Sequence, residues 1–451
     1  MKYEEITLKS GMKLFHVPTS SPVAQFQLYT PFGGETLTYR DNAKGDGKIV
    51  SLQPGSAHYF EHVLFILPPV DTKGNKIKYR TRTPKTKKGL RDGLTMFNQN
   101  KTVSCNAYTT SDHTNYWFMG RKNNMQNLDT LLDIVLEPYL PQDRFIGEVG
   151  TILDEARRGL NNKDSVHYDR IKKQIFHKHG AKYPVIGTLE SIPKISVEDV
   201  LSMHDIFYRP SNLTLVVTGR SDLNAIAKVV ETKLDELRIN EYYAPPEIVG
   251  VNEVKDVVVR NNFPHPIKRD DVSLPEVFAS WKKMLEPEKK SKEELLDDHL
   301  IAKLASIVLF GEGSRSRERL IESGLDRSSF GGFVISSKDY LLFSAQENTK
   351  SPERFYNLVF NAGRRAFNEG LDHSEFDYAK NVLMLDAEMD NEFVADLGSQ
   401  LVRWGVRLGD PSGYFDYFNR LNTITLDEVN QRLPKFFPDK GFSATLMVPE
   451  E

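Results

Sequence analysis

The sequence lacks three features that would point to other classes of protein. It has one cysteine, Cys105, in 451 residues, which excludes an intrachain disulfide and is typical of a reducing compartment. It has no run of about 20 apolar residues, and its first residues, MKYEEITLKSGMKL, show no signal-peptide pattern. Its net charge of −3 predicts no general attraction to nucleic acid or to an anionic membrane. We therefore expect a cytoplasmic protein of roughly two or three domains.

The two halves of the chain repeat one order of elements. TNYWFMGRKNNMQNLDTLLDIVLEPYL predicts a strand, a turn and an amphipathic helix, and KDYLLFSAQENTKSPERFYNLVFNAGRRAFNEGL predicts the same order in the second half. Farther along each half, apolar residues recur at a constant offset of 229 residues, from 195 to 424. The pairs are Ile195 with Ile424, Val200 with Val429 and Phe207 with Phe436. So long a repeat indicates two copies of one domain fold.

Each half mixes strands with long helices, which predicts the α+β class. We expect two homologous domains, each a mainly antiparallel β-sheet with helices packed on one face. Pro245 and Pro246 interrupt helix and strand alike, so a linker is predicted near 240–250. The predicted domains are therefore residues 1–240 and residues 250–451.

The stretch GSAHYFEHVLF, residues 55–65, carries the most specific chemical pattern. On a helix, His58 and His62 are four residues apart and lie on one face, so their neutral nitrogens can reach one zinc ion at about 2.0–2.1 Å. Glu61 is displaced by one residue and can reach a water molecule on the metal, as a general base must. This order, H-x-x-E-H, is the inverzincin motif. The alternative is two helix histidines hydrogen-bonded to carbonyl groups.

A hydrolytic zinc site needs a third protein ligand and one open position. In RFIGEVGTILDEARRG, Glu148 and Glu155 are two helical turns apart and share one face. One carboxylate can bind the metal while the other supports the site. Two exposed helix glutamates are the alternative.

These motifs together resemble the pitrilysin/insulysin family of zinc metallopeptidases, which includes the mitochondrial processing peptidases. The resemblance covers most of residues 1–235 and, through the duplication, the second half more loosely. Four stretches carry it, in the order of the family: AHYFEHVLF, NAYTTSDHTNYWF, EVGTILDEARRG and VEDVLSMHDIFYRPSNLTLVVTG.

The resemblance implies a zinc-dependent endopeptidase that hydrolyses short or unfolded peptides within a closed chamber. It implies a metal-bearing first domain and a second domain without the metal motif. The implied metal ligands are His58, His62 and Glu155, and the implied catalytic residues are Glu61, as the base, and Glu148, as the supporting carboxylate. Asn106 and Ala107 match the edge strand that receives the substrate backbone by β-addition.

Two departures from the family pattern bear on function. Residues 73–91 form a basic insertion, read as a solvated loop or as a basic lip that attracts acidic peptides or docks a partner. The family's second domain also supplies an arginine and a tyrosine in a pattern like L-R-x-x-x-G-L-x-Y. Aligning RERLIESGLDRSSF on its Gly-Leu pair puts Leu320 and Arg327 at those two positions.

This missing pair predicts a heterodimer, in which a homologous partner subunit supplies the arginine and the tyrosine; a homodimer is the alternative.

A second function also stays open: a zinc-binding but catalytically idle subunit that serves as a scaffold or a peptide-binding partner. Nucleic-acid binding through residues 73–91 is not expected, because Tyr79 is their only aromatic residue and offers no stacking platform.

Overall fold

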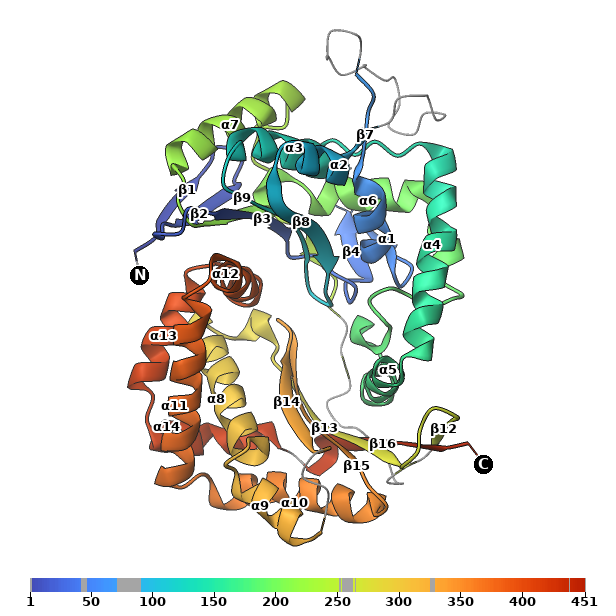
Figure 1. Ribbon diagram of the computed structural model, residues 1–451, viewed down its shortest axis with the longest axis vertical. Coiled ribbons are helices and arrows are strands. Elements are labelled where there is room, and N and C mark those ends of the chain that lie inside the picture. Colours follow the sequence, from blue (N-terminus) through green and yellow to red (C-terminus); the bar gives the residue numbers. More distant parts are fainter. Residues whose placement is uncertain are drawn as a thin grey trace. The chain divides into compact units, whose positions relative to one another are not determined.

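The structure is a computed structural model in which the chain forms two compact units (Figure 1). It describes residues 2–41, 47–70, 91–250, 253, 263, 265–324, 329–437 and 439–450. Unit 1 comprises Met1–Arg158, Tyr183–Val251 and Asn391–Val406. Unit 2 comprises Gly159–Lys182, Asn252–Asp390 and Arg407–Glu451.

Unit 1 is built on a six-stranded sheet with the strand order β1-β2-β10-β3-β9-β8. Only β2 and β10 are parallel, and the other neighbours are antiparallel. The strands are β1 (Glu4–Thr7), β2 (Lys13–Val17), β3 (Ala24–Thr30), β8 (Thr102–Thr109), β9 (Thr114–Gly120) and β10 (Thr214–Thr218). Short pairings add β4 (Thr38–Asp41), β5 (Lys48–Ser51), β11 (Glu247–Ile248), β6 (Ile66–Leu67) and β7 (Arg91–Asp92).

Most helices of the first half cover one face of this sheet. They are α1 (Ser56–Leu64), α2 (Gly93–Gln99), α3 (Asn124–Leu136), α4 (Gln142–Asn161), α6 (Val197–Phe207) and α7 (Leu223–Leu237). Figure 1 shows α3 and α7 lying side by side along the sheet. On β3, Phe26 and Leu28 belong to the buried core that these helices share. Their neighbours Gln25 and Gln27 point to the opposite face, because successive side chains of a strand alternate.

That opposite face is covered by a helix from the second half of the chain, α12 (Val394–Leu408). A Cβ atom added to Gly398 would lie 2.3 Å from Gln27 Nε2, so the glycine lets α12 approach the sheet closely. The Thr218 hydroxyl also donates a hydrogen bond of 2.7 Å to the carbonyl of Val394. The second half therefore contributes a helix to unit 1.

Unit 2 repeats the same design with a five-stranded sheet in the order β12-β16-β13-β15-β14. Again one pair, β12 with β16, is parallel and the rest are antiparallel. The strands are β12 (Ile267–Arg269), β13 (Glu276–Met284), β14 (Gly331–Ser336), β15 (Tyr340–Asn348) and β16 (Phe442–Pro449). The helices are α8 (Lys292–Phe310), α9 (Arg315–Glu322), α10 (Pro352–Glu369), α11 (His373–Asp390), α13 (Gly413–Thr423) and α14 (Leu426–Arg432).

The duplication is visible in local detail as well. Ser196 and Asp199 form a capping box at the start of α6, and Thr425 and Glu428 form one at the start of α14, at the predicted offset. All the paired apolar residues from Ile195 to Phe436 are buried. Strand order and helix caps therefore agree, and the predicted α+β fold of two homologous, mainly antiparallel domains is confirmed.

The predicted division at 240–250 was incomplete because the halves exchange helices. Helix α5 (Lys163–Ile175) comes from the first half and packs on the sheet of unit 2, where Ile171 and Ile175 share a core with Phe278 of β13. Helix α12 makes the reverse exchange. Neither exchange has a sequence signal, since an amphipathic helix does not specify the sheet that it covers. Among the described residues, no helix combines the length and apolar character needed to cross a bilayer.

Candidate metal centre

The short helix α1 carries the H-x-x-E-H motif. It follows Gly55, which has φ +96, and a Cβ atom there would lie 2.5 Å from the carbonyl oxygen of Ile186. Glycine is therefore required for the chain to enter the helix at this point. Tyr59, Phe60 and Val63 are buried in the core, which leaves the motif residues on the half-buried side of the helix.

The three predicted metal ligands converge. His62 Nε2 lies 3.4 Å from Glu155 Oε2, and His58 Nε2 lies 3.9 Å from Glu155 Oε1. One donor atom from each residue lies within 4.8 Å of the others. Donors bound tetrahedrally to zinc at 2.0–2.1 Å are separated by about 3.4 Å. The two imidazoles and the carboxylate therefore fit a zinc ion, with a fourth position open.

Glu148 lies behind one of the histidines rather than among the three donors. Its Oε1 is 3.1 Å from Nδ1 of His62. A hydrogen bond at Nδ1 directs the lone pair of Nε2 toward the site and fixes the ring orientation. Helix α4 is itself held against α1, because the Tyr59 hydroxyl donates a hydrogen bond to the carbonyl of Phe145 and the two rings are in contact. Glu148 therefore lies where it could support the site through His62.

Burial and charge set the protonation of the motif residues. Burial, with a smaller contribution from His62, lowers the pKa of His58 to about 3, so this ring is neutral at physiological pH, as a metal ligand must be. Burial would also lower the pKa of His62, but its hydrogen bond to the Glu148 carboxylate and the charges of Glu61 and Glu155 outweigh it and raise that pKa. Burial raises the pKa of Glu61, partly opposed by its hydrogen bond with Thr109.

The contact between Glu61 and Thr109 was not predicted from the sequence. Thr109 Oγ1 donates a hydrogen bond of 2.6 Å to Glu61 Oε2. Thr109 lies in the stretch NAYTTSDHTNYWF that supported the family resemblance, yet it is 48 residues from its partner. No local pattern links two residues so far apart, which is why sequence reasoning missed it.

Thr109 is the last residue of β8, the outermost strand of the sheet in unit 1. Within the described residues β8 pairs only with β9, through Asn106 with Trp117 and Ala107 with Tyr116. Asn106 is exposed and Ala107 is buried, so their side chains lie on opposite faces. Asn106 Oδ1 accepts a hydrogen bond of 2.9 Å from the backbone N–H of Ala107. That N–H group is therefore directed away from β9, toward the edge available to a further strand.

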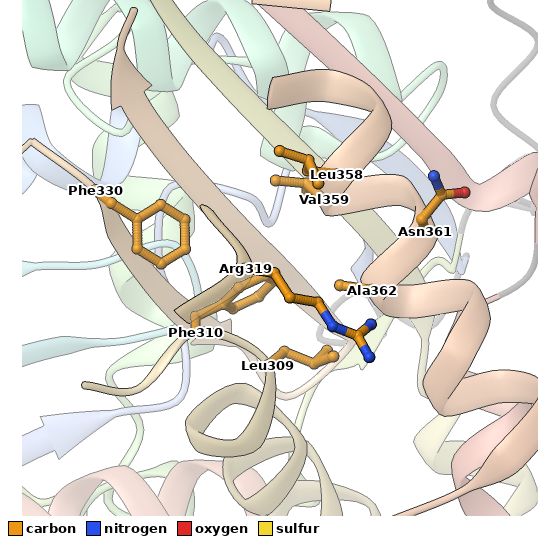
Figure 2. A pocket seen from close by; sticks show the side chains of 8 residues that line it. All are labelled: Leu309, Phe310, Arg319, Phe330, Leu358, Val359, Asn361 and Ala362. Atoms are coloured by element: carbon orange, nitrogen blue, oxygen red, sulfur yellow. The ribbon is translucent and has the colours of Figure 1, made fainter. Parts of the chain in front are cut away.

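A pocket in unit 2 has a different character (Figure 2). Its cavity has a volume of about 70 Å³. Its lining is Leu309, Phe310, Arg319, Phe330, Leu358, Val359, Asn361 and Ala362. Figure 2 shows the Arg319 guanidinium beside the apolar side chains of Leu309 and Ala362. Among the described residues that line it there is no histidine, cysteine or carboxylate, so these residues offer no zinc-binding set.

Two predictions concern parts of the chain outside the described residues. The basic insertion is described only at its last residue, Arg91, because residues 71–90 are outside that range. Arg327 is also outside it, and so is the side chain of Leu320. The basic lip and the missing arginine–tyrosine pair therefore stay predictions.

Fold and site together define a two-unit α+β protein in which two histidines and a glutamate of unit 1 could hold a metal ion. Comparison with known proteins agrees. The chain is 24% identical to the uncharacterized zinc protease YmfH of Bacillus subtilis, over 98% of this chain and 96% of that protein. It is 23% identical to the mitochondrial-processing peptidase subunit beta of Caenorhabditis elegans, over 98% of this chain and 88% of that protein. The putative M16-like peptidase from Alicyclobacillus acidocaldarius has the same fold, with a TM-score of 0.84 and 23% identity. The match covers 100% of this chain and 98% of that chain.

The family profile described as "Peptidase M16 inactive domain" matches residues 194–383. The chain is therefore similar in sequence and in fold to peptidase M16 proteins, which confirms the family resemblance predicted from the motifs. The matched residues begin after Glu155, so the description "inactive domain" refers to a part of the chain that contains none of His58, Glu61 and His62.

Proposed function

We propose that this chain is a zinc-dependent endopeptidase that hydrolyses short or unfolded peptides. One observation carries the proposal: the donor atoms of His58, His62 and Glu155 converge beside Glu61, and Glu61 contacts the end of an open strand edge. A peptide added to that edge would run toward Glu61, and main-chain hydrogen bonding would make the binding tolerant of sequence.

The residues divide the chemistry as follows. His58, His62 and Glu155 would hold the zinc, and Glu148 would orient the His62 ring. A zinc ion, when bound, supplies a Lewis acid that polarises the peptide carbonyl and makes a water molecule a better nucleophile. The Glu61 carboxylate accepts the proton of the attacking water and then transfers it to the nitrogen of the leaving amine. The raised pKa of Glu61 suits a group that both accepts and releases a proton.

We also propose that the chain works with a homologous subunit in the cytoplasm. A relative with which this chain shares nearly its whole length is named as a subunit of a processing peptidase. The predicted lack of the arginine–tyrosine pair, at Leu320 and Arg327, supports a partner that supplies it. The cytoplasmic location rests on the single cysteine of the sequence.

The competing proposal is a zinc-binding subunit that does not catalyse. Digestion of a peptide library by the zinc-loaded protein separates the two, with and without a homologous M16 chain encoded by the same organism. Cleavage that zinc chelation abolishes and zinc restores is the expected result. If a loaded and folded protein cleaves no peptide under either condition, the idle subunit is the better description.

A further inference from the structure

The hydrogen bond between Thr109 and Glu61 gives the carboxylate a defined orientation. Thr109 Oγ1 lies 2.6 Å from Glu61 Oε2, a short distance that is typical of a hydroxyl bound to a charged carboxylate. In the part of the chain that the structure describes, no other group donates a hydrogen bond to this carboxylate. One oxygen is therefore held, and the other is left for a water molecule.

The donor belongs to a rigid part of unit 1. Thr109 pairs with Thr114 at the end of the β8–β9 hairpin. The turn between them is bound to a neighbouring segment, since the N–H groups of Gly34 and Glu35 donate hydrogen bonds to the carbonyls of Thr110 and Ser111 at 2.9 and 2.8 Å. Side-chain orientation set by so constrained a hairpin changes little when substrate binds.

The same hairpin continues the edge proposed to bind substrate. Thr109 and Ala107 are two residues apart on β8, so both side chains point to the face that α1 covers. Ala107 is buried there, and its backbone N–H is directed to the open edge. The short stretch of β8 from Ala107 to Thr109 therefore fixes the position of the Glu61 carboxylate relative to the proposed peptide-binding edge.

We propose that Thr109 is a positioning residue: its hydroxyl holds Oε2 of Glu61 so that Oε1 faces the water that attacks the peptide bond. This inference rests on the proposed peptidase function and deepens it. A residue that only filled space beside Glu61 would not need its hydroxyl group, and a positioning residue would. Valine and serine separate these roles, because valine keeps the shape of threonine without the hydroxyl and serine keeps the hydroxyl.

The experiment compares Thr109→Val and Thr109→Ser with the wild-type protein, using a peptide from the library digestion. For Thr109→Val we expect kcat to fall by about 10- to 100-fold, as for loss of a hydrogen bond to a charged group, with KM and zinc affinity changed less than about twofold. Thr109→Ser should stay within about threefold of wild type. Equal losses in the two variants, or a loss confined to KM, would overturn the proposal.

A structural readout tests the proposal independently of activity. In crystal structures of the zinc-loaded proteins, the Glu61 carboxylate should keep its orientation in Thr109→Ser and rotate away in Thr109→Val. An unchanged orientation of the Glu61 carboxylate in Thr109→Val would contradict the proposal for Thr109, whether or not the proteins cleave peptides. Absence of peptide cleavage in all the proteins, by itself, would count only against the peptidase function. Thr102→Val is the matched control, because Thr102 begins the same strand and donates to the carbonyl of Phe97; its kinetics should match wild type.

Discussion

Units 1 and 2 share one fold but carry different residues at the position of the metal motif. In each unit a helix packs against the outermost strand of the sheet, α1 against β8 and α8 against β14. Both helices end in the same apolar residues, Val-Leu-Phe at 63–65 and at 308–310. Aligning these ends puts Lys303, Ser306 and Ile307 where α1 has His58, Glu61 and His62. The fold uses the apolar end of the helix in both units, whereas the motif residues His58, Glu61 and His62 have no counterparts in α8.

The residues of α8 have other uses. The Lys303 ammonium lies 4.8 Å from the centre of the Tyr417 ring, and Ser306 is buried. Lysine, serine and isoleucine offer no zinc-binding set. The difference between the units therefore predicts that one copy binds metal and performs chemistry, while the other contributes structure.

The largest effect on activity is expected for Glu61, the proposed general base in unit 1. Replacing Glu61 by Gln removes the proton acceptor but leaves the three ligands in place, so kcat should fall by about a thousandfold with zinc content unchanged. Peptide hydrolysis and metal analysis of the same preparation check this. The matched change in unit 2, Ser306→Ala, should leave both quantities near wild type. Wild-type turnover by Glu61→Gln would remove Glu61 from its proposed role.

Acid should weaken the attachment of α5 to the sheet of unit 2 more than the attachment of α12 to the sheet of unit 1. His167 on α5 is buried and lies 3.2 Å, at Nε2, from the carbonyl of Thr445 on β16. Burial, partly opposed by this hydrogen bond, lowers the pKa of His167 to about 4 in the folded protein, compared with about 6.5 in an unfolded chain. The corresponding anchor of α12, from Thr218 to Val394, does not titrate.

The sign of the effect follows from proton binding. Above pH 6.5 neither state of His167 is protonated and its contribution to stability is complete. As the pH falls from 6.5 toward 4, the unfolded chain takes up a proton that the folded one does not, and the free energy of unfolding decreases by about 3 kcal/mol. Denaturant titrations between pH 7 and pH 4 measure this decrease. Replacement by Gln, which keeps a donor for Thr445, should remove that part of the pH dependence; an identical dependence would show that His167 is not responsible.

Smaller changes are expected for a buried valine in each unit, and they distinguish residues needed for packing from residues needed for metal binding. Val63 in α1 and Val308 in α8 occupy the aligned position and are each 1% exposed. Val63→Ala and Val308→Ala should each lower the free energy of unfolding by about 2 kcal/mol, through lost burial and a residual cavity. Only Val63→Ala, next to His62, should also weaken zinc binding. Zinc affinity that falls equally in both variants would argue against a site confined to unit 1.

The smallest effect concerns Glu148, which acts on the metal through His62. Glu148→Gln keeps an acceptor for Nδ1 of His62 but loses the charge, so zinc affinity should fall by about tenfold. Competition with a chelator measures this change. Asp154→Asn, an exposed position on the same helix that pairs with Arg157, is the control and should have wild-type affinity. A loss of zinc as complete as that expected for a ligand variant would make Glu148 itself a ligand.

Features of the molecule that follow from a local or repeated pattern were predictable from the sequence. The spacing of His58 and His62 places both on one helix face, and the 229-residue offset revealed the duplicated fold. Contacts that only the tertiary structure creates were not predictable. Thr109 reaches Glu61 because a hairpin ends beside α1, and α5 and α12 cover sheets of the opposite half of the chain. Glu155 is intermediate: its helix face was predictable, but its approach to the histidines required the family resemblance.

The metal centre is tested most directly by the number of zinc ions that one chain binds, measured by native mass spectrometry and elemental analysis after zinc loading. A single metal centre in unit 1 predicts one tightly bound ion in the wild-type protein and none when His58 and His62 are both replaced by Ala. Wild-type protein without zinc, or a double variant that retains it, would contradict the metal centre in unit 1.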